Sequence, residues 1–374
     1  MDGYAHIMHD KIAFVKPMNS RNENEHILGV FTELIQKCGV KNIQVEELYS
    51  LDDDFSHMKP MYGLIFLFKW RPEQDDRPTD VGCDEELFFA RQMITNACAT
   101  QALLSILLNI RSDEVDIGDS LQNFKDFVIA MPPDMRGEAI NNLDNVRLAH
   151  NSFNRPEPFL PDKKEVAGPD DDVFHFIAYI PFKDKIYELD GLKPGPICLG
   201  DLNEGQDWIE AVAPHIQSRI ARYAASEIRF NLMAVIKDQR VVLQDKIDEC
   251  ATRTETLEAV LDGHDDVIAD ESFTTVELED TEGFEQLVYG NDLPSLCAQL
   301  RAERTRKMEL VPTLEEVEMK FSKWHNENIR RRHNYIPLCV AMLKLLAKEK
   351  KLEPLIENAR ERQNERRQAA AKGK

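Results

Sequence analysis

Cys98 is the residue of this sequence best placed to act as a nucleophile. It lies where a buried helix is expected to begin, at 97–108. The unpaired N–H groups and the positive dipole end of a helix N-terminus favour a thiolate. The small neighbours Ala97 and Ala99 leave room for a substrate backbone. A structural cysteine packed in a helix is the alternative interpretation of this residue.

Gln92 lies six residues before Cys98 and adds a possible role in acyl transfer. Its side-chain amide could donate to a developing oxyanion beside the Cys98 backbone N–H. A surface glutamine before a helix is equally compatible with this position.

A histidine and an aspartate lie on two strand-like runs, 173–180 and 185–190, which a hairpin turn joins. If the hairpin pairs residues whose numbers sum to 365, His175 lies directly opposite Asp190. Directly opposed side chains share one face of a sheet. The carboxylate would then orient the imidazole and stabilise the imidazolium, as in a catalytic triad. A strand histidine satisfied by a nearby acid is the alternative.

The order cysteine, histidine, aspartate, with a glutamine before the cysteine, is the papain-like arrangement. The separation of 77 residues between Cys98 and His175 is much shorter than in papain itself. The pattern therefore indicates thiol chemistry of this type on a different chain layout.

Strands and helices intermix up to about residue 240, which predicts an α+β domain. The expected strands are 61–70, 173–180, 185–190 and 227–235, and the expected helices are 30–38, 97–108, 138–150 and 208–223. From 239 to 374 the chain is typical of a helical extension, interrupted by an acidic insert at about 262–283 and ending in a basic tail. We therefore expect a domain boundary near residue 240.

Composition excludes several classes of protein. Hydrophobic residues make up 43% of the 374 residues, which excludes wholesale disorder. The seven cysteines are scattered and contain no C-x-x-C pair, so we expect neither a disulfide framework nor a metal, and no cofactor. The N-terminus lacks the apolar region of a signal peptide, and no apolar run is long enough to span a bilayer. We expect a soluble protein of the cytoplasm and nucleus.

The charge is divided unevenly along the chain. The total is −21, but residues 320–374 carry 15 basic and six acidic residues, a net charge of +9. The acidic body argues against binding to nucleic acid or a membrane surface and suits a basic partner. The run Arg330–His333 is more typical of a solvated face than of a nucleic-acid site. The contrast indicates two modules with different partners.

Five stretches together resemble the ubiquitin carboxyl-terminal hydrolase family. They are YGLIFLFKW at 62–70, Gln92 followed by NACATQA at 96–102, HNSF at 150–153, FHF at 174–176 and YELDGL at 187–192. The resemblance implies a papain-like fold with a central antiparallel sheet flanked by helices, over a catalytic domain at 25–238. It implies that Cys98 is the nucleophile, His175 the general base and acid, Asp190 the orienting carboxylate and Gln92 the oxyanion donor.

The resemblance also implies a crossover loop over the active site, at about 153–172, that favours small or unfolded leaving groups unless it moves. The family's usual Trp-x-x-Ile-Glu-Ser opening is replaced here by EHILGV at 25–30, after 24 residues with no counterpart. The N-terminal edge of the ubiquitin site therefore departs from the family pattern.

The C-terminal part resembles the helical extension of proteasome-associated members of the family. The resemblance implies docking to the adaptor domain of a proteasomal ubiquitin receptor, and binding of the same region by a subunit of a chromatin-remodelling complex. An apolar stripe on this part is formed by Leu338, Met342, Leu345, Leu346, Leu352 and Leu355. The stripe fits either a partner helix or this chain's own helix within 284–319.

These features give three functional hypotheses. The first is a thiol hydrolase that cleaves after the C-terminal glycine of ubiquitin. The second is a docked ubiquitin-binding scaffold with little turnover. The third is a protease for another ubiquitin-like modifier, which would use the same chemistry. An intact set of four site residues favours an enzyme over a scaffold.

Overall fold

The structure is a computed structural model that describes residues 21–51, 53–70, 77–80, 82–94, 97–153, 174–224, 230–262 and 293–372. Of the crossover loop expected at 153–172, only Phe153 lies within the described residues. Almost all of the acidic insert, and residues 1–20 of the N-terminal extension, also lie outside them.

Six strands form one antiparallel sheet in the order β1-β6-β2-β3-β4-β5. They are β1 (Ile43–Glu47), β2 (Met61–Lys69), β3 (Phe174–Phe182), β4 (Lys185–Leu189), β5 (Ile197–Asp201) and β6 (Phe230–Lys237). β2 is almost entirely apolar and is buried at most positions, because helices cover both faces of the sheet. The predicted α+β fold with a central antiparallel sheet is confirmed.

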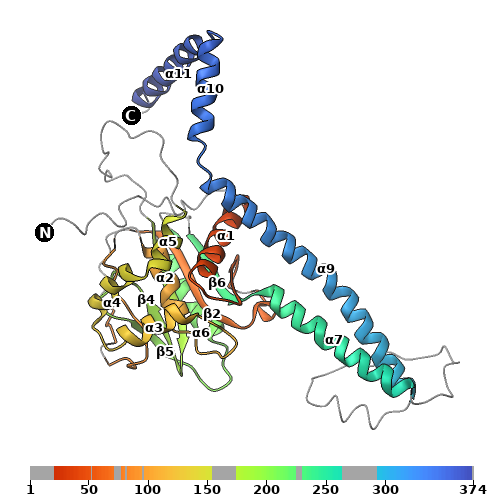
Figure 1. The fold of residues 1–374 in the computed structure, drawn as a ribbon. Coiled ribbons are helices and arrows are strands. Elements are labelled where there is room, and N and C mark those ends of the chain that lie inside the picture. The colour runs from red at the N-terminus through yellow and green to blue at the C-terminus, as the bar shows by residue number, and fades with distance from the viewer. Residues whose placement is uncertain are drawn as a thin grey trace.

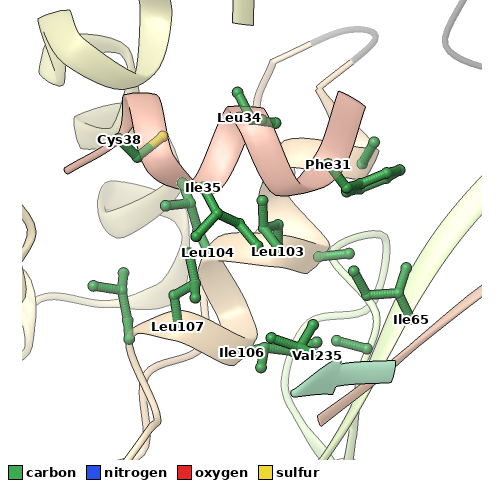
Figure 2. Packing of buried hydrophobic residues seen from close by; sticks show 14 of the residues in the cluster. Phe31, Leu34, Ile35, Cys38, Ile65, Leu103, Leu104, Ile106, Leu107 and Val235 are labelled. Carbon is green, nitrogen blue, oxygen red and sulfur yellow. The ribbon is translucent and has the colours of Figure 1, made fainter. Parts of the chain in front are cut away.

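Helices pack on both faces of the sheet (Figure 1). They are α1 (Arg21–Lys37), α2 (Cys98–Leu107), α3 (Asp119–Val128), α4 (Pro133–Ala139), α5 (Asp144–Asn151) and α6 (Trp208–Ala224), with short 3-10 turns at Ser56–Met58 and Ile140–Asn142. Alternate strand side chains enter separate cores, so Ile65 and Leu67 pack with α1 and α2 while Leu64 and Phe66 pack with α6. Figure 2 shows α1 lying over α2 in the larger core.

α2 is buried along its whole length after Cys98, which fixes its N-terminus in place. It approaches the sheet closely at Gly63 of β2. A Cβ at Gly63 would lie only 2.8 Å from Cγ2 of Ile106, so glycine is needed for this contact. The tight packing turns a helix made of small and aliphatic residues into a rigid support for Cys98.

The boundaries of two helices differ from those expected from sequence. The helix expected at 138–150 is divided, because Leu143 has extended backbone angles (φ −80°, ψ 90°) between α4 with its 3-10 turn and α5. The helix expected at 30–38 begins earlier, at Arg21, within the segment left unassigned. Apolar spacing marked where these helices are buried rather than where they start and stop.

The chain after β6 is helical. It contains α7 (Gln239–Asp262), α9 (Leu293–Arg332), α10 (Ile336–Lys348) and α11 (Leu352–Lys372). α7 leaves the body of the molecule, and the 40-residue α9 runs back along it towards α1 (Figure 1). Leu257 of α7 and Leu296 of α9 form a small buried cluster between the two helices.

The C-terminal end of α9 is anchored on α1. Trp324 is 3% exposed and packs against Gly29, where a Cβ would lie 2.7 Å from the Cβ of Trp324. Asn328 donates to the Gly29 carbonyl (2.9 Å) and to Glu33 (2.7 Å), and Arg332 pairs with Glu33 (2.6 Å). α9 therefore completes the core of the α+β domain as well as extending from it.

Replacing Trp324 with alanine should lower the free energy of unfolding by about 3–5 kcal/mol, since a buried indole leaves a cavity between α1 and α9. Urea unfolding followed by circular dichroism measures the loss. Ile329 is on the same helix but 47% exposed, so Ile329→Ala is a matched control with an expected change below about 1 kcal/mol. Equal changes in the two variants would show that Trp324 does not anchor α9.

Candidate active site

Cys98 is the first residue of α2, and Ala97 caps the helix without a side-chain hydrogen bond. The N–H groups of this first turn therefore have no partner within the helix, which favours negative charge on the thiol and on an oxyanion beside it. Cys98 is half-buried, in contrast to the fully buried residues that follow it. The nucleophile proposed from sequence is thus accessible at a helix N-terminus.

His175 and Asp190 form a close, buried pair. His175 Nε2 lies 2.7 Å from Asp190 Oδ1, and both side chains are 6% exposed. The Leu192 backbone N–H donates to the same Asp190 oxygen at 2.9 Å. Cys98 lies close enough to this imidazole to raise its pKa, so one ring faces both the thiol and the carboxylate.

The predicted register of the hairpin is wrong by two residues. β3 and β4 pair Tyr179 with Glu188 and Phe182 with Lys185, so paired numbers sum to 367 and the turn is Lys183-Asp184. Lys183 takes a φ of 53°, which tightens the turn to two residues. A shift of two keeps each side chain on the same face, and His175 and Asp190 therefore still meet, diagonally rather than directly.

The electrostatics of the pair favour a charged imidazole. Burial lowers the pKa of His175, but hydrogen bonds and Coulombic attraction from Asp190 and Cys98 outweigh it and raise the pKa to about 9. Burial raises the pKa of Asp190, while His175, the Leu192 N–H and Arg219 together bring it below its usual value. At neutral pH the pair is an imidazolium and a carboxylate, and the protonated Nε2 donates to Asp190.

Gln92 lies in the segment that borders this pair. Its backbone N–H donates to the Gly191 carbonyl at 2.8 Å, which joins the segment to the turn after Asp190. Its side-chain Nε2 donates to the Ile94 carbonyl at 3.2 Å. A Cβ at Gly191 would lie 3.1 Å from the Cβ of Gln92, so the two segments need glycine here. The structure thus brings Gln92 to the acid–base pair.

Two further groups around the site were not predicted from sequence. His150 Nδ1 lies 2.7 Å from Thr100 Oγ1 and ties α5 to the first turn of α2. Burial lowers the pKa of His150 to about 4, so its ring is neutral at physiological pH. Glu188 forms a buried ion pair with Arg219 at 2.7 Å. Glu188 itself was the signal in the sequence. A charged residue in a strand expected to be buried requires a partner of opposite charge.

Neither a metal site nor a membrane span is found in the part of the chain that the structure describes. No three His, Cys, Asp or Glu side chains among these residues are grouped so that they could hold a metal ion. No described helix is both long and apolar enough to cross a membrane.

Comparison with known proteins identifies the family. A family model described as ubiquitin carboxyl-terminal hydrolase, family 1, matches residues 24–221, and a second, described as ubiquitin carboxyl-terminal hydrolases, matches residues 308–352. The chain is 44% identical to ubiquitin carboxyl-terminal hydrolase isozyme L5 of Dictyostelium discoideum, over 91% of this chain and 95% of the relative. It is 39% identical to ubiquitin carboxyl-terminal hydrolase ubh-4 of Caenorhabditis elegans, over 88% of each chain.

Solved structures give the same result. The Trichinella spiralis UCH37 catalytic domain bound to ubiquitin vinyl methyl ester is 40% identical, with a TM-score of 0.50 over 57% of this chain and 93% of that chain. A structure of Trichinella spiralis UCH37 bound to the same compound is 33% identical, also with a TM-score of 0.50, over 76% of this chain and 96% of that chain. The chain therefore belongs to family 1 of the ubiquitin carboxyl-terminal hydrolases.

Proposed function

We propose that this chain is a deubiquitinating cysteine protease that hydrolyses the bond after the C-terminal glycine of ubiquitin in conjugates at the proteasome. The observation that carries the proposal is the buried His175–Asp190 pair, which lies beside a cysteine at a helix N-terminus. Relatives along almost the whole chain are named hydrolases, which favours turnover over a scaffold role.

In the proposed reaction the Cys98 thiolate attacks the carbonyl carbon of the ubiquitin C-terminal glycine. Gln92 and the backbone N–H groups at the start of α2 stabilise the oxyanion. The His175 imidazolium gives its proton to the leaving amine as the C–N bond breaks, which leaves a thioester on Cys98.

The second half of the reaction releases ubiquitin. Neutral His175 takes a proton from a water molecule, and the resulting hydroxide attacks the thioester carbonyl. The C–S bond breaks, the Cys98 thiolate is restored, and His175 is again an imidazolium. Asp190 keeps the imidazole oriented and stabilises its charge throughout both steps.

Turnover of fluorogenic modifiers tests the substrate. We expect the full chain to release the fluorophore from the C-terminus of ubiquitin at least 100-fold faster, in kcat/KM, than from other ubiquitin-like modifiers. Preference for another modifier would establish the third hypothesis from sequence instead, and no turnover of any of them would contradict hydrolysis altogether.

We further propose that α10 and α11 dock the adaptor domain of a proteasomal ubiquitin receptor, and that a chromatin-remodelling subunit uses the same face. α10 is strongly apolar, yet it contains no buried residue. Leu338, Met342, Leu345 and Leu355 are 51 to 61% exposed. Packing of this stripe on the chain's own helix, left open by the sequence, is therefore wrong for α10. Activity in the cytoplasm and nucleus, where such partners act, is part of this proposal.

A charge in the apolar stripe of α10 should abolish docking without affecting hydrolysis. Met342→Asp is expected to weaken binding of the isolated adaptor domain at least about 10-fold, measured by calorimetry, because a carboxylate would be buried in an apolar interface. Ala347→Asp, an exposed position on the other side of the same helix, is the matched control and should bind like the wild type. Equal affinity of all three proteins would exclude this face as the docking site.

A further inference from the structure

Arg219 is a buried charged residue that the reaction described above does not use. It lies on α6, beneath the sheet, and is 5% exposed. Its guanidinium pairs with Glu188 at 2.7 Å and donates to the Tyr179 hydroxyl at 3.4 Å. Glu188 is itself 1% exposed and also accepts two hydrogen bonds from Arg77, at 2.7 and 3.0 Å. Burial of so many charges requires close compensation among them.

Two contacts lead from Arg219 towards the acid–base pair. Glu188 lies two residues before Asp190 in the chain. A displacement of Glu188 would therefore also displace the turn that holds Asp190. Arg219 also lies over the ring of Phe68, 4.9 Å from its centroid. Phe68 is the cross-strand partner of His175, and the two rings meet edge to face at 5.8 Å.

Positive and negative side chains alternate around the site. Arg77, Arg219 and protonated His175 are positive, and Glu188 and Asp190 are negative. Burial raises the pKa of Tyr179, so its phenol stays neutral at physiological pH. Cys98 belongs to α2, Arg219 to α6, His175 and Tyr179 to β3, and Glu188 to β4, while Asp190 follows β4 and Arg77 lies in the segment at 77–80.

We propose that Arg219 is a positioning residue for catalysis, which holds the Glu188–Asp190 segment and the Phe68–His175 contact in place and supplies the buried positive charge that balances Glu188 beside the pair. This inference rests on the proposed thiol chemistry of Cys98. The positive charge of Arg219 favours the Asp190 carboxylate, and we expect the same attraction to act on a negative sulfur at Cys98, which Arg219 does not contact. Within about 10 Å, at an effective dielectric of about 20, one buried charge moves a titration by about one pH unit.

The test compares Arg219→Met, Glu188→Gln and the double variant, which remove the positive charge, the negative charge and both. Two pH profiles are measured: kcat/KM for ubiquitin-fluorophore, and the rate of Cys98 alkylation by iodoacetamide, followed by mass spectrometry of the Cys98 peptide. We expect both limbs of the kcat/KM profile and the acid limb of alkylation to move up by about one pH unit in Arg219→Met. They should move down by a similar amount in Glu188→Gln and return to the wild-type position in the double variant.

Arg77→Met is the matched control. It also removes a positive partner of Glu188, but at a residue whose side chain is 31% exposed. Its shift should be less than half that of Arg219→Met. A role confined to the stability of the fold predicts a lower melting temperature with unmoved limbs in every variant, and that result would overturn the inference. If Arg219→Met does not fold, the opposite shift in Glu188→Gln and its cancellation in the double variant still decide the question.

The two readouts separate this inference from the proposed function. If the acid limb of Cys98 alkylation shifts in the variants but no protein hydrolyses ubiquitin, the result would support the role of Arg219 and contradict the proposed substrate. Hydrolysis of ubiquitin with unshifted limbs in every variant would leave the proposed function intact and refute the role of Arg219.

Discussion

Cys98→Ala is expected to reduce hydrolysis of ubiquitin-fluorophore at least about 10⁴-fold, to the background rate, because the proposed thioester forms on the Cys98 thiol. Removal of a nucleophile eliminates the covalent route, whereas the loss of a supporting group only slows it. The fold should not change, since Cys98 is half-buried at the beginning of α2 and alanine is a good helix former.

The control for this prediction is Cys83→Ala. Cys83 is also half-buried and reduced, and burial raises its pKa, which makes it a poor nucleophile at neutral pH. It should keep the wild-type rate. Substantial turnover by Cys98→Ala, or loss of turnover in Cys83→Ala alone, would show that the nucleophile has been assigned to the wrong residue.

Asp190→Asn should lower kcat/KM roughly 10²–10⁴-fold. Asparagine keeps the shape of the side chain but removes the negative charge that holds the imidazolium. Asp190 is one of the groups that raise the pKa of His175 to about 9, so its loss should lower that pKa. The reactive form contains the imidazolium, so activity is lost as the pH rises through the pKa of His175. In Asp190→Asn the alkaline limb of the profile should therefore move to a pH below 9.

Fluorophore release between pH 5 and pH 10 measures both effects. Asp184→Asn makes the same chemical change at an exposed residue in the turn of the same hairpin, and it should leave rate and profile unchanged. An Asp190→Asn enzyme with an unmoved alkaline limb would mean that Asp190 does not set the charge of His175.

The placement of the proposed site residues could be predicted from sequence because it depends on local features. The small residues around Cys98 and the apolar residues after it predict a helix that begins there, whichever element that helix packs against. His175 and Asp190 lie on the same face of the hairpin in the predicted register and in every register that differs from it by an even number of residues. That is why the pair forms at 2.7 Å although the predicted register was wrong.

The register error has a physical cause. Pro181 looked like a turn residue, but it lies inside β3 opposite Ile186. The pairing of β3 with β2 ends at Tyr179 and Leu64. Pro181 lies beyond that end, so its missing N–H removes no hydrogen bond between these two strands. The turn is instead made by Lys183, in a positive-φ conformation that its side chain did not suggest.

Contacts between distant parts of the chain could not be predicted. Trp324 belongs by sequence to the C-terminal extension, yet it is buried against Gly29 nearly 300 residues away. Arg219 appears as an ordinary polar position of an amphipathic helix, and only the folded sheet places it against Glu188. Hydrophobic periodicity identifies which residues of an element are buried and contains no information about which element covers them.

Mapping the covalent adduct of a ubiquitin with a C-terminal electrophile tests the central claim most directly. The full chain is treated with ubiquitin vinyl methyl ester, digested, and analysed by mass spectrometry across all seven cysteines. We predict a single adduct on the thiol of Cys98, formed by the wild type and not by Cys98→Ala. No adduct, or an adduct on another cysteine that persists in Cys98→Ala, would contradict the assignment of Cys98, His175 and Asp190 as a ubiquitin-hydrolysing site.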